Sequence, residues 1–302
     1  MFGRTAIVLA VAMFLIGSVC TSALAQDVEA DIAAITELMN QATLACATGD
    51  VELYLSRFTE DVVAMPPGIP TEIGIAQLRA SMEGLFGAYD LELPYTVQEV
   101  VVPGDWAFAR STFVFSLTPK EGGETATFIG KELDIFKRQA DGSWKLYIEC
   151  YNYDAPPPAA KLTGTSRAPG LAKMAQEDDA MTMYREMCDL YTLACTTGDV
   201  DLYVSNYTDD GVQLPPDSPI RIGSEQIRAS TSAAFDLFSL GMAISPQEAE
   251  ITGDWAFGRC DYSVSLTPKE GGPTTTFDAS RDLDIFKRQA DGSWKYYISC
   301  WN

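Results

Sequence analysis

The chain has 302 residues, of which 42 are acidic and 21 basic, a formal net charge of −21. This length predicts about two domains, and so acidic a surface repels phosphate backbones, which argues against a nucleic-acid partner. Histidine is absent, which excludes Ser-His-Asp and Cys-His catalysis and every His-containing metal site. Any general base must be a carboxylate, Lys, Tyr or thiolate. Because no Walker loop, G-x-G-x-x-G or C-x-x-C motif occurs, we expect no metal and no cofactor.

Residues 1–25 resemble a secretory signal peptide. Arg4 is followed by an apolar run that ends near Val19, and Ala23-Leu24-Ala25 forms a small-x-small cleavage pattern. The run is short for a membrane span of about 20 residues, although an N-terminal anchor is the alternative. We therefore expect an exported protein, periplasmic or secreted, with no membrane association after cleavage.

The rest of the chain is an internal duplication. Leu133–Lys145 recurs unchanged as Leu283–Lys295, and the shorter run Gly104–Phe108 recurs at the same relative place. The offset grows by one residue along the chain, which places one extra residue of the second copy near Ala279. A period this long indicates duplicated domains rather than a solenoid. The predicted parts are a first domain over 27–152, a Pro-rich linker over 153–176 and a second domain over 177–302.

Each copy predicts helices first and strands afterwards. In the first copy, apolar residues spaced by three and four predict a helix from Val28 to Thr48, which ends at Gly49. Further helices are expected over 51–58 and 76–89, with a strand over 62–65. Period-2 alternation then predicts a four-strand antiparallel meander over 96–102, 106–117, 125–138 and 144–151. This order predicts an α+β fold: two tandem cone-shaped domains, each with helices packed on a curved antiparallel sheet.

A curved sheet wrapped around a helix leaves a conical cavity, where a functional site is expected. Apolar alternation assigns Phe113 and Phe115 to the cavity face of one strand. The same criterion places Lys131 on the cavity face with Leu133 and Ile135. It turns Glu132 and its neighbour Asp134 away from the cavity.

Several motifs together resemble SnoaL-like domains of the nuclear transport factor 2-like superfamily, which also holds ketosteroid isomerases and polyketide cyclases. They are Pro66-Pro-Gly68, Gly104-Asp-Trp-Ala-Phe-Ala-Arg110, Leu117-Thr-Pro-Lys120, Gln139-Ala-Asp-Gly-Ser-Trp-Lys145 and the closing Tyr151-Asn-x-Asp154. The resemblance covers both copies and implies the cone fold. It leaves function open, because this fold hosts isomerases, cyclases, dehydratases and non-catalytic binding domains. Since such domains often pair through their sheets, we expect the copies to form an intramolecular pseudo-dimer.

The chain departs from the isomerase pattern at two places. The resemblance places the catalytic Asp base at Met65-Pro66 and Leu214-Pro215, where neither copy has a carboxylate. It places the neutral, hydrogen-bond-donating Asp at Lys131 and Arg281. Isomerase chemistry of that type is therefore disfavoured.

The candidate ligand-binding residues occur in equivalent pairs. A cation facing the cavity could bind a carboxylate or enolate, Trp and Tyr could line the cavity, and a buried Asn needs a partner. For each pair the competing interpretation is ordinary packing or ion pairing. The candidates are Lys131 and Arg281, Trp106 and Trp255, Tyr54 and Tyr203, and Asn152 and Asn302.

Six cysteines follow the predicted signal peptide, an even number that favours disulfides in an oxidising compartment. Equivalent positions and predicted faces suggest one bridge in each copy, Cys46 with Cys150 and Cys195 with Cys300. A third bridge would join Cys188 with Cys260, which occur only in the second copy. Buried free thiols are the alternative.

Three functions stay open. The leading hypothesis is an exported protein, not an enzyme, that binds a small, mostly apolar and possibly anionic molecule in its cavities. The second is an isomerase, cyclase or lyase, which an open cavity with an inward-facing carboxylate would favour. The third is a structural or protein-interaction module whose cavities are filled by side chains.

Overall fold

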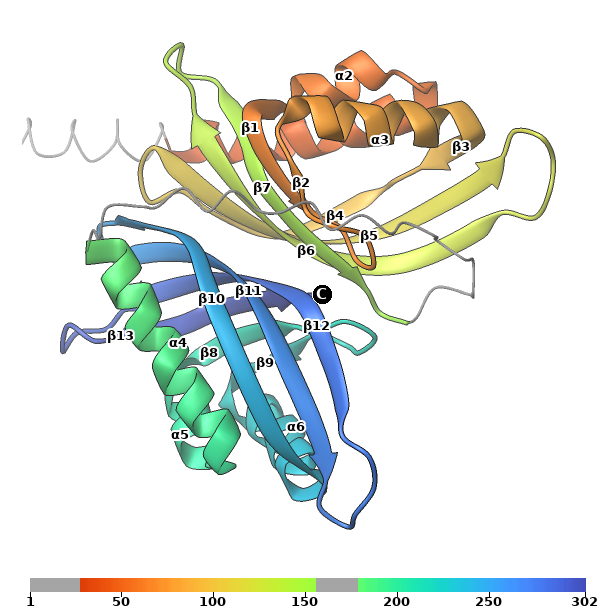
Figure 1. The fold of residues 1–302 in the computed structure, drawn as a ribbon. Helices are drawn as coiled ribbons and strands as arrows, with labels where there is room; N and C mark the ends of the chain where they lie inside the picture. The colour runs from red at the N-terminus through yellow and green to blue at the C-terminus, as the bar shows by residue number, and fades with distance from the viewer. Residues whose placement is uncertain (1–27, 156–178) are drawn as a thin grey trace, which may run out of the picture.

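The computed structural model describes residues 28–155 and 179–302, and Figure 1 shows two similar α+β domains. The predicted signal peptide and most of the predicted linker lie outside these residues, so export and the exact domain bounds stay predictions. Within the described residues, no helix is long and apolar enough to span a membrane.

The Gly-Asp motif joins two helices in each copy. Residues 28–48 are helical, and Gly49 follows with a φ of +68°, a left-handed conformation that ends helices. Asp50 then caps α2 (Val51–Ser56), because its Oδ1 accepts a hydrogen bond from the Leu53 amide at 2.9 Å. The second copy repeats this arrangement between α4 (Asp179–Thr197) and α5 (Val200–Ser205). The last helix of the first copy is α3 (Ile75–Ala88), and its counterpart in the second copy is α6 (Gly223–Leu237).

The predicted meander is present and forms part of a larger, mixed sheet. The strands of the first copy are β1 (Phe58–Met65), β2 (Glu72–Ile73), β3 (Tyr89–Glu92), β4 (Tyr95–Val101), β5 (Trp106–Pro119), β6 (Ala126–Arg138) and β7 (Trp144–Tyr153). Their order is β2-β1-β7-β6-β5-β3, with β4 also paired to β5. The meander is antiparallel as predicted, and β1 extends the sheet at its edge by pairing parallel to β7.

The second sheet has the order β10-β11-β12-β13-β8-β9. Its strands are β8 (Tyr207–Leu214), β9 (Arg221–Ile222), β10 (Phe238–Thr252), β11 (Trp255–Pro268), β12 (Thr275–Arg288) and β13 (Trp294–Trp301). Pro94 separates β3 from β4 in the first copy, whereas Ala243 at the equivalent position lets β10 run unbroken. The extra residue near Ala279 forms a β-bulge, where β12 has one more residue than the facing segment of β11. Ala279 has a φ of +65°.

The two sheets face one another, and the helices lie on their outer sides (Figure 1). Apolar side chains between the sheets form one core shared by both copies, and separate cores lie under the helices of each copy. The shared core includes edge-to-face contact of Trp106 with Phe257, whose ring centroids are 5.2 Å apart. Tyr297 donates a hydrogen bond to Glu99, and Tyr147 donates the equivalent bond to Glu248. Each sheet is therefore buried on both faces.

One pair of substitutions separates the outer cores of the two copies. Ile35 and Ala109 in the first copy correspond to Tyr184 and Gly258 in the second. A Cβ placed on Gly258 would lie 2.6 Å from the Tyr184 ring. The Tyr184 ring therefore fits against the strand because residue 258 is a glycine and has no Cβ.

This packing predicts that Gly258→Ala destabilises the protein by about 1–3 kcal/mol, because the ring must move. Adding Tyr184→Ile, which restores the first copy's combination, should recover part of the loss, and chemical denaturation of the four variants measures the coupling. Gly87→Ala is the control, because its Cβ would meet nothing within 4 Å. A Gly258→Ala protein as stable as the parent would contradict this account.

Candidate active site

The β-pleat assigns each residue of β6 either to the helix side or to the other copy. Leu133 and Ile135 lie in the core between the sheets. Glu132 and Asp134 therefore point the opposite way, toward the helices of the first copy. Register agrees, since Glu132 pairs with Ser111 and Asp134 pairs with Glu149 of β7. The prediction that these two carboxylates face away from the cavity is wrong, because both faces of the sheet are buried and apolar alternation cannot tell them apart.

A bulge adds to this error on β7. The register of β6 against β7 shifts between Ile135 and Phe136. Leu146 consequently packs in the outer core of the first copy, whereas Ile148 and Cys150 pack between the sheets. Unbroken period-2 alternation would place all three residues on one face.

The first copy has a partly open cavity of about 90 Å³ between α3 and the sheet. Its walls are mainly apolar, and its polar groups gather on the strands. The lining residues include Leu78, Met82, Phe86, Leu91, Phe113 and Phe115, together with Tyr54, Tyr95, Tyr151, Glu72, Glu132 and Glu149. An apolar chamber with a few convergent polar groups is the usual form of a small-molecule site.

Three buried carboxyl groups lie together at the sheet side of this cavity. Glu132, Asp134 and Glu149 each offer an oxygen, and these atoms all lie within 4.8 Å of one another. The Ser111 hydroxyl donates a hydrogen bond to Glu132 at 2.8 Å. Among the described residues, Oδ1 of Asp134 has no hydrogen-bond partner. We call these three residues the carboxyl cluster.

Burial raises the pKa values of the carboxyl cluster. Loss of water, followed by the charge of Glu149, raises the pKa of Glu132 to about 8, although the Ser111 hydrogen bond opposes the shift. Burial raises the pKa of Glu149 to about 7, against the lowering influence of the Arg57 charge. Burial also raises the pKa of Asp134 well above its ordinary value. The cluster can therefore hold and exchange protons near neutral pH.

Arg57 is a cation whose charge lowers the pKa of all three groups of the carboxyl cluster. It is 3% exposed, and its Nε and Nη1 donate to the carbonyls of Tyr54 and Leu38 at 3.2 and 3.3 Å. Its guanidinium carbon lies 4.5 Å from the centre of the Tyr54 ring. Sequence analysis missed Arg57 as well as the carboxyl cluster.

Oxygen-only ligands such as those of the carboxyl cluster suit hard cations, for example Mg²⁺, Ca²⁺ or Mn²⁺. Protons can neutralise the same groups, and the raised pKa values of Glu132 and Glu149 favour protons at neutral pH. The geometry is thus compatible with either occupant.

The second copy keeps only part of this arrangement. Asp282 and Asp284 replace Glu132 and Asp134, and Ser299 stands where the first copy has Glu149. The Tyr184 hydroxyl donates to Asp284 at 3.2 Å, a contact that Ile35 cannot make in the first copy.

Polar side chains occupy more of the interior of this second copy. Gln213, equivalent to Ala64, donates to the hydroxyls of Tyr203 and Tyr207 at 3.0 Å each. Tyr203 also shares a hydrogen bond with Tyr191 at 2.8 Å. The two copies are therefore chemically unequal.

Lys131 and Arg281 do not line the cavity of the first copy; they join the two copies. The Lys131 ammonium lies 2.5 Å from Asp154 and donates to the Ser218 carbonyl of the second copy at 2.9 Å. Arg281 donates to the Ile69 and Pro66 carbonyls of the first copy at 2.7 and 2.8 Å. The placement expected for these cations is wrong because their strand face is the contact between copies.

The two candidate asparagines form equivalent contacts between the copies. Asn152 donates to the Leu214 and Trp301 carbonyls at 2.8 Å each. Asn302 donates to the carbonyls of Met65 and Tyr151. These side chains satisfy the ends of the facing strands.

The candidate aromatic residues separate into two groups. Trp106 and Trp255 pack between the sheets, which removes them from the cavity of the first copy. Tyr54 does line that cavity, so its contact with a ligand stays a prediction. Tyr203 occupies the equivalent place in the second copy within the tyrosine network.

The six described cysteines are buried, and no disulfide joins any two of them in this structure. Cys46 lies in the outer core of the first copy while Cys150 lies between the sheets, so the bridge predicted between them is wrong. The same separation excludes the predicted bridge of Cys195 with Cys300. Cys188 and Cys260 share the outer core of the second copy, and their pairing stays a prediction.

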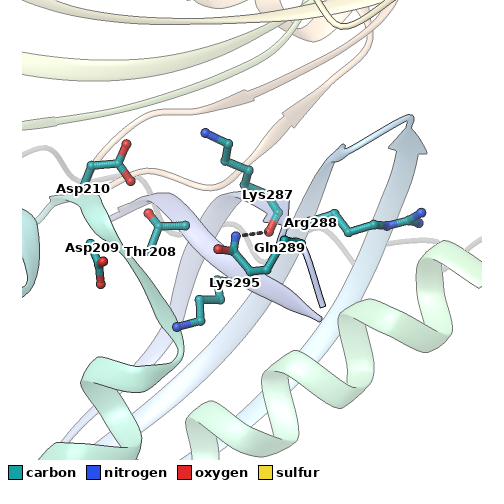
Figure 2. Close-up of a pocket in the computed structure, with 8 residues that line it drawn as sticks. Thr208, Asp209, Asp210, Lys287, Arg288, Gln289 and Lys295 are labelled. Carbon is teal, nitrogen blue, oxygen red and sulfur yellow. Dashed lines mark hydrogen bonds between the residues drawn. The ribbon is translucent and has the colours of Figure 1, made fainter. Parts of the chain in front are cut away.

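A second hollow of about 280 Å³ lies at the end of the second sheet (Figure 2). Charged and polar side chains line it, among them Asp209, Asp210, Lys287 and Lys295. The Gln289 amide donates to the Lys287 carbonyl at 2.9 Å. It lacks the buried, convergent carboxyl groups of the first cavity.

Arg281→Met should weaken the contact between the copies, because it leaves the carbonyls of Ile69 and Pro66 without this donor. The expected loss is about 1–3 kcal/mol in the free energy of unfolding by urea. Small-angle scattering tests the predicted pseudo-dimer in solution, and two separated lobes in the parent protein would contradict it. Arg228→Met is the control, because its ion pair with Asp201 is largely exposed and should contribute about 1 kcal/mol or less.

The carboxyl cluster predicts a fall in stability with rising pH. A carboxyl group whose pKa is raised in the folded state binds more protons there than in the unfolded chain, so stability falls between the two pKa values. For Glu149, with an ordinary value of 4.5 and a folded value of about 7, the loss is about 3 kcal/mol across this window.

Glu149→Gln should therefore flatten the dependence of the unfolding free energy on pH and be more stable than the parent at pH 8. Urea denaturation across this range measures the difference. Glu121→Gln, at an exposed loop, is the control and should follow the parent. Parallel curves for Glu149→Gln and the parent would contradict the shift.

The family model of the SnoaL-like domain matches residues 39–147. Among solved structures, the chain is similar to a ketosteroid isomerase-like protein from Erwinia carotovora atroseptica, at 28% identity over 42% of this chain and 98% of that one, with a TM-score of 0.39. It is also similar to a conserved protein from Planctomyces limnophilus, at 27% identity over 40% of this chain and 94% of that one, with a TM-score of 0.39. No curated protein matches the chain. The family match and the repeated strand order lead to one conclusion: the chain carries a SnoaL-like domain in its first copy and a second domain of the same α+β architecture.

Proposed function

We propose that the first copy is an acid–base enzyme acting on a small, mostly apolar carbonyl compound. The observation that carries this proposal is the carboxyl cluster facing an apolar cavity, with pKa values of about 7 and 8 for Glu149 and Glu132. The expectation of a non-catalytic binding protein rested on the duplicated fold, the missing isomerase base and the cations Lys131 and Arg281. An inward-facing carboxylate was the feature expected to favour an enzyme instead, and Glu132 and Glu149 supply it.

The two glutamates divide the roles by their pKa values. Burial raises the pKa of both groups, but the Arg57 charge opposes the rise at Glu149 whereas the Glu149 charge adds to it at Glu132, which favours a carboxylate at Glu149 and a neutral acid at Glu132. Glu149 is then the general base that takes a proton from the carbon beside the substrate carbonyl. A neutral donor can hydrogen-bond to the enolate oxygen, and buried groups aimed at such a charge lower the barrier strongly.

Two kinds of neutral donor are available for the enolate. Glu132 can serve while protonated. The hydroxyls of Tyr54 and Tyr95 can also serve, because burial raises the pKa of both well above the ordinary value and keeps them neutral. Return of the proton to a different carbon completes an isomerisation.

The cavity limits the size and charge of the substrate. An apolar cavity of about 150 Å³ can hold benzene, so about 90 Å³ suits a smaller molecule unless α3 moves. The cations expected to bind an anion lie between the copies instead, which favours a neutral ligand.

The chemical asymmetry of the copies favours the first one for catalysis. Glu149 has no carboxyl counterpart in the second copy, and Asp284 is bonded to Tyr184. We infer that the second copy is mainly structural. Export of the protein, which rests on residues 1–25, is part of the proposal and is tested by locating the mature chain in cell fractions.

Exchange of protons on small ketones tests the chemistry directly. Acetone and butanone in D₂O, followed by proton NMR, should lose their α-hydrogen signals faster with the protein than with buffer. Glu149→Gln should lower the catalysed rate by about 10²–10⁴-fold, the usual contribution of a general base. The rate should rise with pH near 7 and fall above about 8, if Glu132 must stay protonated.

Asp284→Asn is the matched control in the second copy and should keep the parent rate. A chelator, added in a parallel sample, separates proton chemistry from metal chemistry, and we expect it to have no effect. Ketones that bind without exchange would overturn catalysis in favour of a binding protein. An absence of both binding and exchange would favour the structural module.

A further inference from the structure

We propose that Cys150 and Cys300 form a disulfide that joins the two copies across their contact. These are equivalent residues of the duplication, at the same place on β7 and β13. Each is buried and has a relative exposure of 0%. The bridge differs from both pairings that sequence equivalence suggests for these residues.

The contact between the two residues is reciprocal. The Cys150 sulfur lies 3.3 Å from the Cys300 carbonyl oxygen, and the Cys300 sulfur lies 3.3 Å from the Cys150 carbonyl oxygen. In an arrangement with two-fold symmetry, a residue meets its own counterpart only at the axis. The pair therefore lies at the pseudo-two-fold axis of the molecule.

The surroundings hold the two sulfurs in register. The Asn152 amide lies 3.9 Å from the Cys300 sulfur, and the Asn302 amide lies 4.0 Å from the Cys150 sulfur. Both amides are anchored by hydrogen bonds to carbonyls of the other copy. The bridge requires each sulfur to turn, by rotation about its Cα–Cβ bond, from the carbonyl oxygen of the other cysteine toward the other sulfur.

The chemistry is ordinary thiol–disulfide exchange with a low-molecular-weight or protein disulfide as the oxidant. The Cys150 thiolate attacks the donor, forms a mixed disulfide and releases one donor thiolate. The deprotonated Cys300 sulfur then attacks the Cys150 sulfur, closes the bridge and releases the second donor thiolate. Two electrons pass to the donor, and the two protons lost by the cysteines go to water or to the released thiolates.

Burial decides when this exchange can happen. The loss of water and the adjacent Cys150 thiol raise the pKa of Cys300 well above its ordinary value. Because the thiolate is the reactive form, the closed protein should react slowly with an external oxidant. Oxidation is expected while the copies come together, before the sheets exclude solvent.

Peptide mapping identifies the pairing without ambiguity. The reduced, denatured full chain is refolded with oxidised glutathione, free thiols are blocked with N-ethylmaleimide, and trypsin digestion follows without reduction. Cleavage after Lys145, Lys161 and Lys295 gives one peptide with Cys150 and another with Cys300. The expected result is peptide 146–161 joined to peptide 296–302, with a mass about 2 Da below the sum of the two thiol peptides.

Two variants make the assignment specific. Cys300→Ser should abolish the joined peptide and leave Cys150 alkylated, whereas Cys46→Ser should leave the joined peptide intact. Circular dichroism checks that each variant folds. The proposal is overturned if Cys150 and Cys300 are both alkylated after oxidative refolding, or if either is found joined to the peptide of Cys46 or of Cys195.

Discussion

The structure depends on two sheets that are each buried on both faces. One face of each sheet packs under helices, and the other packs against the second copy. Neighbouring residues along a strand therefore lie in different surroundings, one under the helices and the next against the other copy, because successive side chains point to opposite faces. On β6, Lys131 and Leu133 contribute to the contact between copies, whereas Glu132 lines the cavity and Asp134 lies beside it on the same face. A shift of one residue would exchange the two sets.

This alternation explains why polar groups lie in two separate layers. Between the copies, cations and amides meet main-chain carbonyls; Arg281 and Asn302 of the second copy hold the strand-turn segment of the first copy near Pro66. Inside the first copy, the carboxyl cluster has few hydrogen-bond donors, and burial raises the pKa of each of its members. Buried polar groups that are fully paired stabilise a unique arrangement, and those left partly unpaired are suited to chemistry.

The two copies share one architecture but differ in the side chains of their interiors. The second copy exchanges Ile35, Ala109 and Glu149 for Tyr184, Gly258 and Ser299, and the new tyrosine satisfies one aspartate. Such a set of changes favours packing over proton transfer. The contact between the copies has reciprocal hydrogen bonds, so the two copies are alike where they meet and differ in their interiors.

The sequence alone determined the duplication, the order of helices and strands, the meander and the family resemblance, because repeats and periodicity are local properties. It could not determine which face of a doubly buried strand meets the helices, since Leu133 and Glu132 are both buried. The bulge near Tyr147 and the parallel pairing of β1 with β7 also arise only in the folded chain. For this reason the carboxyl cluster, the role of Lys131 and the partner of Cys150 were decided by tertiary structure.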